Sequence, residues 1–329
     1  MELRQLGTSD LMVSPIIFGA WAIGGWLWGG TDDDEAVKAI QAGIDAGITT
    51  IDTAPVYGFG HSETVVGRAI KGRRDRVTIA TKCGPRIDRT DGVFSMRTIG
   101  PDGKEVALHR VLKKDSIIEE CERSLKRLGI EAIDLYQCHW PDYTTPVAET
   151  MEALVRLQKE GKIRYIGVSN YSSERINESL HYGRVVSAQP RYNLLKREPE
   201  AELLPWCRER GVGVICYSPM EHGLLSGKVT MDRTFPTTDL RAAHPWYKPQ
   251  NRRRVLDALD KIRPIAAAHG ATLAQVAVNW VIHRPGVTAA LVGARNPAQA
   301  RENAGAASFR LTEEEHAFVG KTFELGAPV

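Results

Sequence analysis

Short apolar segments rich in β-branched residues recur along the chain, and each is separated from the next by a segment with helical spacing. The eight segments span residues 16–18, 49–52, 77–80, 133–136, 163–168, 185–188, 212–215 and 289–292. Continuously apolar strands are typical of a parallel sheet that helices cover on both faces. Alternating strands and helices form either a closed barrel or an open doubly wound sheet, and the count of eight favours the barrel. The sequence therefore predicts an α/β fold of the (β/α)8 barrel class.

Capping residues and a proline mark the ends and interruptions of the expected helices. Thr31 is placed to cap the first helix, and Ser116 with Glu119 has the spacing of a capping box. A helix that begins near residue 251 contains Pro264, which predicts a kink or a break there.

Two regions lie outside the repeat of strands and helices. Residues 3–13, with a turn at 7–10, are expected to form an N-terminal β-hairpin that covers the bottom of the barrel. The interval between the last two strands holds a long loop at 228–250 and then extra C-terminal helices. Since no linker-like or low-complexity stretch divides the chain, residues 1–329 are predicted to form one domain.

Composition excludes several classes of function. The net charge of +3 is too small to indicate a nucleic-acid partner. The five cysteines are scattered without a CxxC pair, so no disulfide framework and no zinc site are expected, and the acidic run 32–35 indicates a helix start rather than a metal site. No signal peptide is recognised, and a cytoplasmic protein is expected. Residues 11–31 carry no charge, but their proline and glycines favour a strand and loop over a membrane span.

Four ionisable side chains follow the predicted strands at or near their carboxyl ends. Asp52 ends the second strand, Lys82 follows the third, His139 follows the fourth, and Tyr57 lies five residues beyond Asp52. Each has an ordinary explanation when taken alone: a turn cap, a solvated strand end, a half-buried imidazole and a loop aromatic. Because the carboxyl ends of barrel strands meet at one mouth, we expect these four side chains to converge there.

Such a set is suited to donating a proton to a carbonyl oxygen. A tyrosine hydroxyl is a weak acid with a pKa near ~10, and a lysine cation beside it is expected to lower that pKa. An aspartate would fix the lysine, and a histidine N–H would orient the carbonyl. Since no side chain supplies a hydride, a cofactor is required.

The motifs around these residues resemble the aldo-keto reductase superfamily. They include Asp52-Thr53-Ala54-Pro55-Val56-Tyr57-Gly58 and Asp134-Leu135-Tyr136-Gln137-Cys138-His139, with further matches at 81–82, 167–170, 217–220, 223–228 and 293–295. The likeness runs from Phe18 to Asn303. Residues 57–63 and 239–241 are most similar to the bacterial general-stress-protein branch.

The resemblance implies an NADP(H)-dependent oxidoreductase that reduces aldehydes or ketones, reactive dicarbonyls and sugar carbonyls among them, to alcohols. It implies Tyr57 as the general acid, Lys82 and Asp52 as the pair that tunes it, and His139 as the donor that orients the carbonyl. The substrate pocket is expected to involve Trp21, Tyr57, His139 and Trp140. The only partner expected is a small-molecule carbonyl substrate, without nucleic acid, membrane or metal, and a monomer is expected.

The same resemblance implies the cofactor contacts. The residues concerned are Gly19, Ala20, Trp21, Asp52, Ser169, Asn170, Gln189, Tyr217, Ser218, Pro219, Met220, Glu221, His222, Gly223, Lys228, Arg241, Gly293, Arg295, Gln299, Glu302 and Asn303. Within this set Tyr217 would stack on the nicotinamide, and Arg295 with Gln299 would receive the 2′-phosphate. One departure is Gly293, where many members carry a lysine, which keeps NADH open as the alternative cofactor.

Two other functions fit parts of the pattern. A regulatory subunit that binds NADPH and turns over poorly would share the fold, but the histidine at 139 favours catalysis. A Schiff-base aldolase would use Lys82 as its nucleophile, and borohydride trapping of a substrate would identify it.

Overall fold

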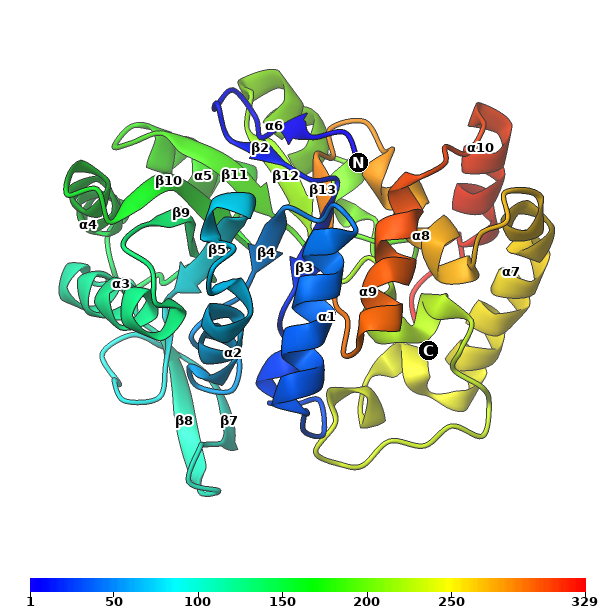
Figure 1. The fold of residues 1–329 in the computed structure, drawn as a ribbon, viewed down its shortest axis with the longest axis horizontal. Helices are drawn as coiled ribbons and strands as arrows, with labels where there is room; N and C mark the ends of the chain where they lie inside the picture. The colour runs from blue at the N-terminus through cyan, green and yellow to red at the C-terminus, as the bar shows by residue number, and fades with distance from the viewer.

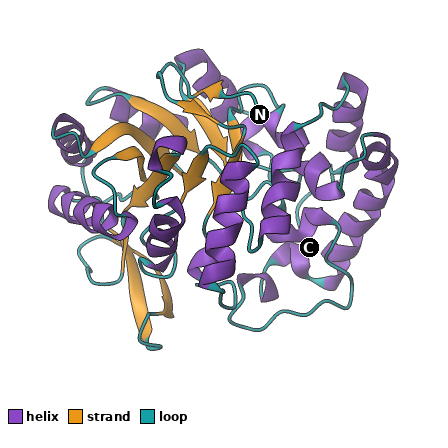
Figure 2. Ribbon diagram, in the orientation of Figure 1, coloured by secondary structure: helices purple, strands orange, loops and turns teal.

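The computed structural model describes all 329 residues, and its centre is a closed barrel of parallel strands inside a ring of helices (Figure 1, Figure 2). Around the barrel the strands follow in chain order, and the last pairs with the first. They are β3 (Ile16–Gly19), β4 (Thr50–Asp52), β5 (Thr78–Cys83), β9 (Ile133–Cys138), β10 (Ile163–Ser169), β11 (Val185–Gln189), β12 (Gly213–Cys216) and β13 (Ala289–Val292). The predicted barrel is confirmed.

Ten α-helices surround the strands. They are α1 (Asp33–Asp45), α2 (His61–Ile70), α3 (Lys114–Leu128), α4 (Val147–Lys159), α5 (Ser173–Leu180), α6 (Leu203–Arg210), α7 (Pro249–Ala268), α8 (Leu273–Ile282), α9 (Pro297–Ala304) and α10 (Glu313–Thr322). Helix α10 packs against α7 and α8 on the side of the molecule away from α3 and α4 (Figure 1). Helices α7 and α8 come from the long interval before the last strand, and α10 comes from the C-terminal end of the chain. They are the extra helices that the sequence predicted.

Two predicted helix caps are wrong, and the break that Pro264 allowed for does not occur. Asp32, not Thr31, caps α1, because its carboxylate accepts from two backbone N–H groups of the first turn, each at 3.0 Å. Ser116 does not cap α3, which begins at Lys114, and its hydroxyl bonds to side chains instead. Helix α7 continues through Pro264 to Ala268 without a break.

The N-terminal hairpin of β1 (Arg4–Gln5) and β2 (Met12–Val13) closes the bottom of the barrel, as predicted. Its buried side chains form one apolar cluster with inward-facing residues of the barrel strands. The cluster consists of Leu6, Leu11, Val13, Ile17, Ala80, Leu135, Val186, Ile215, Ala289 and Leu291. The turn packs so closely that a Cβ on Gly7, whose φ is +59°, would lie 2.4 Å from the carbonyl oxygen of Gly211.

An additional antiparallel sheet, which the sequence analysis did not predict, is inserted after β5. It consists of β6 (Pro85–Arg86), β7 (Val93–Ile99) and β8 (Glu105–Arg110), in the order β6-β8-β7. In Figure 1 the β7–β8 hairpin extends from the end of the barrel opposite the N-terminal hairpin. Its strands are half exposed, so they lack the apolar pattern that marks the barrel strands.

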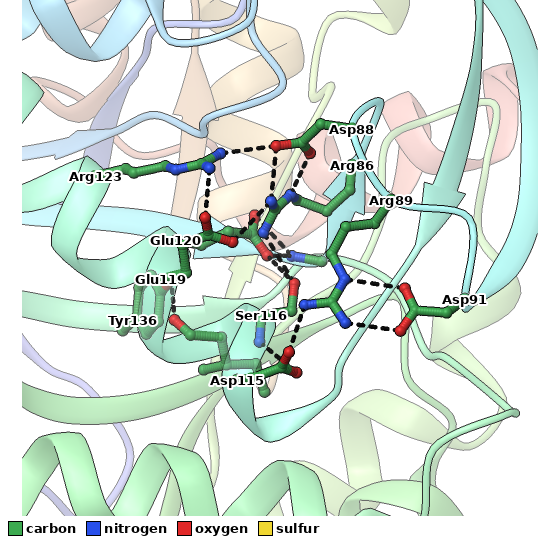
Figure 3. Close-up of polar contacts among 12 residues, drawn as sticks. Arg86, Asp88, Arg89, Asp91, Asp115, Ser116, Glu119, Glu120, Arg123 and Tyr136 are labelled. Atoms are coloured by element: carbon green, nitrogen blue, oxygen red, sulfur yellow. Dashed lines mark hydrogen bonds and ion pairs between the residues drawn. The ribbon is translucent and has the colours of Figure 1, made fainter.

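Ion pairs hold this inserted sheet against α3. Figure 3 shows Arg86 between Asp88 and Glu119, with hydrogen bonds of 2.6 and 2.9 Å. Arg89 bonds to Asp91 and, at 2.7 Å, to an aspartate in the first turn of α3. The network anchors β6, which pairs with β8, and the loop after β6 to helix α3.

No single helix is long and apolar enough to cross a membrane. Helices α7 and α8 pass a test of length and hydropathy when taken together, but the chain bends by 86° between them.

The packing of the N-terminal hairpin against the bottom of the barrel predicts a stability effect that can be measured. Leu6 is fully buried in the apolar cluster, so Leu6→Ala is expected to lower the free energy of unfolding by about 2–5 kcal/mol. Met12→Ala on the same hairpin removes a side chain that is 43% exposed and serves as the control. Urea denaturation of both variants measures the difference, and equal stabilities would show that the hairpin does not close the core.

Candidate active site

The site is built on a buried ion pair in the upper half of the barrel. Lys82 from β5 and Asp52 from β4 are almost completely inaccessible to solvent, and the Lys82 ammonium donates to the Asp52 carboxylate. Lys82 Nζ also donates to the carbonyl oxygen of Thr53 at 2.9 Å. The second carboxylate oxygen of Asp52 accepts from the amides of Gln137 and Gln189 at 3.2 and 2.9 Å. A buried pair is tolerated because its remaining polar atoms are satisfied in this way.

Tyr57 lies above the ion pair, on the loop after β4. Its hydroxyl is 3.3 Å from Lys82 Nζ, and that nitrogen is 5.0 Å from the centre of the ring. Trp21 stacks on the Tyr57 ring at 6.0 Å between centroids, and His139 meets the ring edge to face at 5.6 Å. The structure therefore brings together the four ionisable residues that the sequence placed at strand ends.

A second group of polar side chains follows β10 and β12. Asn170 donates to the carbonyl oxygen of His139 at 2.9 Å and accepts from the Tyr217 hydroxyl at 2.9 Å. The Ser169 hydroxyl donates to the carbonyl oxygen of Gln189 at 2.9 Å. These bonds connect the ends of four neighbouring strands and fix the position of His139.

Burial decides the charge states in the site. Burial first, and the negative charge of Asp52 second, raise the pKa of Tyr57 well above its usual value. Burial, with the positive charges of Lys82 and Arg110, holds the pKa of His139 well below its usual range, so the imidazole is neutral at neutral pH. Burial also lowers the pKa of Lys82, while Asp52 opposes that shift. The expected lowering of the Tyr57 pKa by Lys82 is thus wrong, because desolvation dominates.

A cavity of about 270 Å³ opens beside Tyr57 and extends along the mouth of the barrel. Most of the residues expected to contact a cofactor line it. They are Gly19, Ala20, Trp21, Asp52, Tyr217, Ser218, Pro219, Met220, His222, Gly223, Lys228, Arg241, Gly293, Arg295, Gln299, Glu302 and Asn303. Ala22, Trp28, Ser226, Ala274, Leu291, Val292 and Ala294 complete the wall. The lining carries three cationic side chains against two carboxylates, which suits an anionic ligand.

Four expected cofactor residues and two expected pocket residues do not line this cavity. The Ser169, Asn170 and Gln189 side chains are engaged in the hydrogen bonds described above. Glu221 is buried in an ion pair with Arg191 and accepts from Asn193 at 2.6 Å. His139 and Trp140 lie on the other side of Tyr57, toward the inserted sheet.

The backbone is strained at the mouth of the barrel and nowhere else among non-glycine residues. The non-glycine residues with positive φ are Leu27, Phe59, Asn170, Ser218, Glu221 and His222, and all follow the carboxyl ends of barrel strands. Three of them lie in residues 218–222, where the cavity wall turns into the short helix η4 (Glu221–Ser226). Strain of this kind persists where the surrounding structure fixes a functional geometry.

Sequence reasoning missed Gln137, which bonds to Asp52. Gln137 and His139 are two residues apart on β9 and its extension, so both point into the barrel. A polar residue at an inward position of a buried strand was the signal that could have identified it. Trp28, for which the sequence left a place in the pocket wall and a role in shielding the loop backbone both open, stands in the cavity wall.

Comparison with known proteins decides the family. The model of the aldo/keto reductase family matches residues 15–322. The chain belongs to the aldo/keto reductase family. This aldo/keto reductase is thus an oxidoreductase of a family that uses a nicotinamide cofactor, as the sequence motifs predicted.

Bacterial members are similar over nearly the whole length. The chain is 38% identical over 327 residues to aldo-keto reductase YhdN of Bacillus subtilis, covering 98% of this chain and 94% of that protein. It is 39% identical over 321 residues to the NADH-specific methylglyoxal reductase of Escherichia coli, covering 96% of each. Among solved structures, the glycerol dehydrogenase AKR11B4 of Gluconobacter oxydans superposes with a TM-score of 0.88 at 37% identity, covering 99% of this chain and 96% of that one.

The site predicts how Tyr57 ionises. Because its pKa is raised, the phenol should stay protonated at neutral pH and form phenolate only above pH ~10. The difference in ultraviolet absorbance between the wild type and Tyr57→Phe, titrated without cofactor, isolates this one hydroxyl. A tyrosinate signal that appears between pH ~7 and ~9 would mean that Lys82 outweighs burial.

Proposed function

We propose that this protein is an NADPH-dependent reductase of small aldehydes and ketones in which Tyr57 donates the proton. One observation carries the proposal: the Tyr57 hydroxyl, at the wall of the cavity, lies 3.3 Å from Lys82 Nζ, and Lys82 is itself held by Asp52. A positioned acid next to a fixed cation is the arrangement that stabilises charge as a proton leaves.

The cavity fits a nicotinamide dinucleotide. Buried polar atoms in its wall lack partners, including the indole nitrogens of Trp21 and Trp28 and one oxygen of Glu302. Gly223 has open space around the position of a Cβ, so the backbone there is accessible to a pyrophosphate. When bound, the reduced nicotinamide supplies the hydride that no side chain can supply. Tyr217 and Asn170 would then position the ring, and Lys228 the phosphates.

The residues around the carbonyl would divide the work as follows. The protonated Tyr57 donates its proton to the carbonyl oxygen, and the Lys82 charge stabilises the developing phenolate. Neutral His139 donates a hydrogen bond to the same oxygen and so orients the carbonyl. Asp52 keeps Lys82 in place and reduces the cost of its burial.

A Schiff-base aldolase is disfavoured by the surroundings of Lys82. Its ammonium donates to Asp52, to the Thr53 carbonyl oxygen and to the Tyr57 hydroxyl, so all three N–H bonds are used. The amine is also fully buried, which leaves it no free path to attack a carbonyl.

The preference for NADPH rests on Arg295. Its guanidinium lines the cavity and bonds only to the carbonyl oxygen of Trp28, with no carboxylate partner. Arg241 also stacks on the Trp28 ring, but the Asp239 carboxylate holds its guanidinium through two hydrogen bonds. An unpaired arginine is suited to the 2′-phosphate, which only NADPH carries. The Escherichia coli relative is specific for NADH, so this preference is the part of the proposal that most needs a direct test.

Tyr57→Phe tests the catalytic assignment. Loss of the proton donor should lower kcat for NADPH-dependent aldehyde reduction about 10²- to 10⁴-fold, while the Kd for NADPH stays nearly unchanged. Tyr143→Phe, which alters a tyrosine that is 71% exposed, is the matched control. Near-wild-type kcat in Tyr57→Phe would assign the proton donor to another group.

Arg295→Ala tests the cofactor assignment. The variant should weaken NADPH binding by about 1.5–3 kcal/mol and leave NADH binding nearly unchanged, because only the 2′-phosphate contact is lost. Arg301→Ala removes an exposed arginine from α9, the helix that begins two residues after Arg295, and this side chain lies outside the cavity, so the change should affect neither cofactor. Fluorescence titrations with both cofactors measure the Kd values, and equal losses for the two would contradict the assignment.

A further inference from the structure

Arg110 lies at the mouth of the barrel, beside Trp140 and close to His139. It ends β8 and pairs with Pro85, two residues after the end of β5. The next residue along donates its N–H to the Gly84 carbonyl oxygen at 2.8 Å, so the strand is fixed over the end of β5. Leu108, which shares a face of β8 with Arg110, packs in a cluster with Val56 that contacts Tyr57. Arg110 therefore points to the side of the hairpin that faces the catalytic tyrosine.

The guanidinium of Arg110 is held by an aromatic ring. Its central carbon lies 4.8 Å from the centre of the Trp140 ring, and Trp140 directly follows His139. The charge of Arg110 contributes to the lowered pKa of His139, which agrees with their proximity. Stacking on an indole fixes the plane of a guanidinium without using its hydrogen-bond donors.

Arg110 has no acidic partner, in contrast to its neighbours. The neighbouring arginines of the sheet, of its β6–β7 loop and of α3 each form an ion pair with an aspartate or glutamate; they are Arg86, Arg89, Arg97 and Arg123, and all but Arg97 appear in Figure 3. Arg110 forms none, and its Nε is buried without a hydrogen-bond partner. Burying part of a guanidinium costs free energy when its N–H groups have no acceptor, and an anion would supply the acceptors.

We propose that Arg110, supported by Trp140, is a specificity subsite for an anionic group on the carbonyl substrate. The substrate class is an aldehyde or ketone that also carries a carboxylate or a phosphate. The inference rests on the proposed function, since it places the anion of the molecule whose carbonyl Tyr57 protonates. A guanidinium fork binds either group through paired hydrogen bonds. This subsite is separate from Arg295, which lies in the wall of the cofactor cavity.

Paired substrates test the subsite. We compare kcat/KM for succinic semialdehyde with butanal, and for glyceraldehyde 3-phosphate with glyceraldehyde. The wild type should prefer the anionic member of at least one pair, and the preferred pair identifies the group. Arg110→Met should lower kcat/KM for that member about 10- to 100-fold, mainly through KM, and change the neutral member no more than about threefold. Arg110→Lys should retain part of the preference, because it keeps the charge.

Arg210→Met is the matched control. Arg210 also stacks on a tryptophan, Trp206, but it lies in α6, away from the site, and the substitution removes the same charge. Equal rates for both members of each pair, or equal losses in Arg110→Met, would overturn the subsite while the reductase assignment stands. Failure of the wild type to reduce any aldehyde with either cofactor would overturn the reductase assignment and the subsite with it.

Discussion

The buried ion pair between Lys82 and Asp52 is the constraint on which the site depends. Two charges removed from water cost several kcal/mol each unless their remaining hydrogen bonds are satisfied. Here a backbone carbonyl and the amides of Gln137 and Gln189 satisfy them, and these groups come from different barrel strands. The pair can exist only where a closed barrel brings those strands together, so the fold and the proposed acid role of Tyr57 have a common physical basis.

The barrel interior is divided along its axis. Its lower half is an apolar cluster closed by Leu6 and Leu11 of the hairpin, and its upper half holds the ion pair and the glutamines. The lower half stabilises the fold. Its packing also fixes the positions of β5 and β9, whose upper ends carry Lys82 and His139. Strained backbone is confined to the loops beyond those upper ends. Stability and function thus occupy opposite ends of the same strands, which is typical of barrel enzymes.

The cations around the mouth differ in whether a carboxylate pairs with them. Lys228 is paired with Glu302 at 2.6 Å and Arg241 with Asp239, so these cations are held in place before any ligand arrives. Arg295 and Arg110 have no carboxylate partner, and they lie on either side of Tyr57, toward the cofactor cavity and toward the inserted sheet. An unpaired guanidinium at each side is the arrangement that two anionic ligands would complete.

The sequence by itself determined the barrel and the residues at its mouth. Eight apolar strands of similar length must bury both faces, and parallel strands place Asp52, Lys82 and His139 at one end. The sequence did not determine the inserted sheet, because its half-exposed strands lack the continuous apolar pattern of the barrel strands. Nor did it determine that Gln137 bonds to Asp52. Only the tertiary structure decided the ionisation of Tyr57, where burial reversed the pKa shift expected from Lys82 alone. Spacing along a chain fixes which groups share an end of a barrel, whereas desolvation depends on everything packed around them.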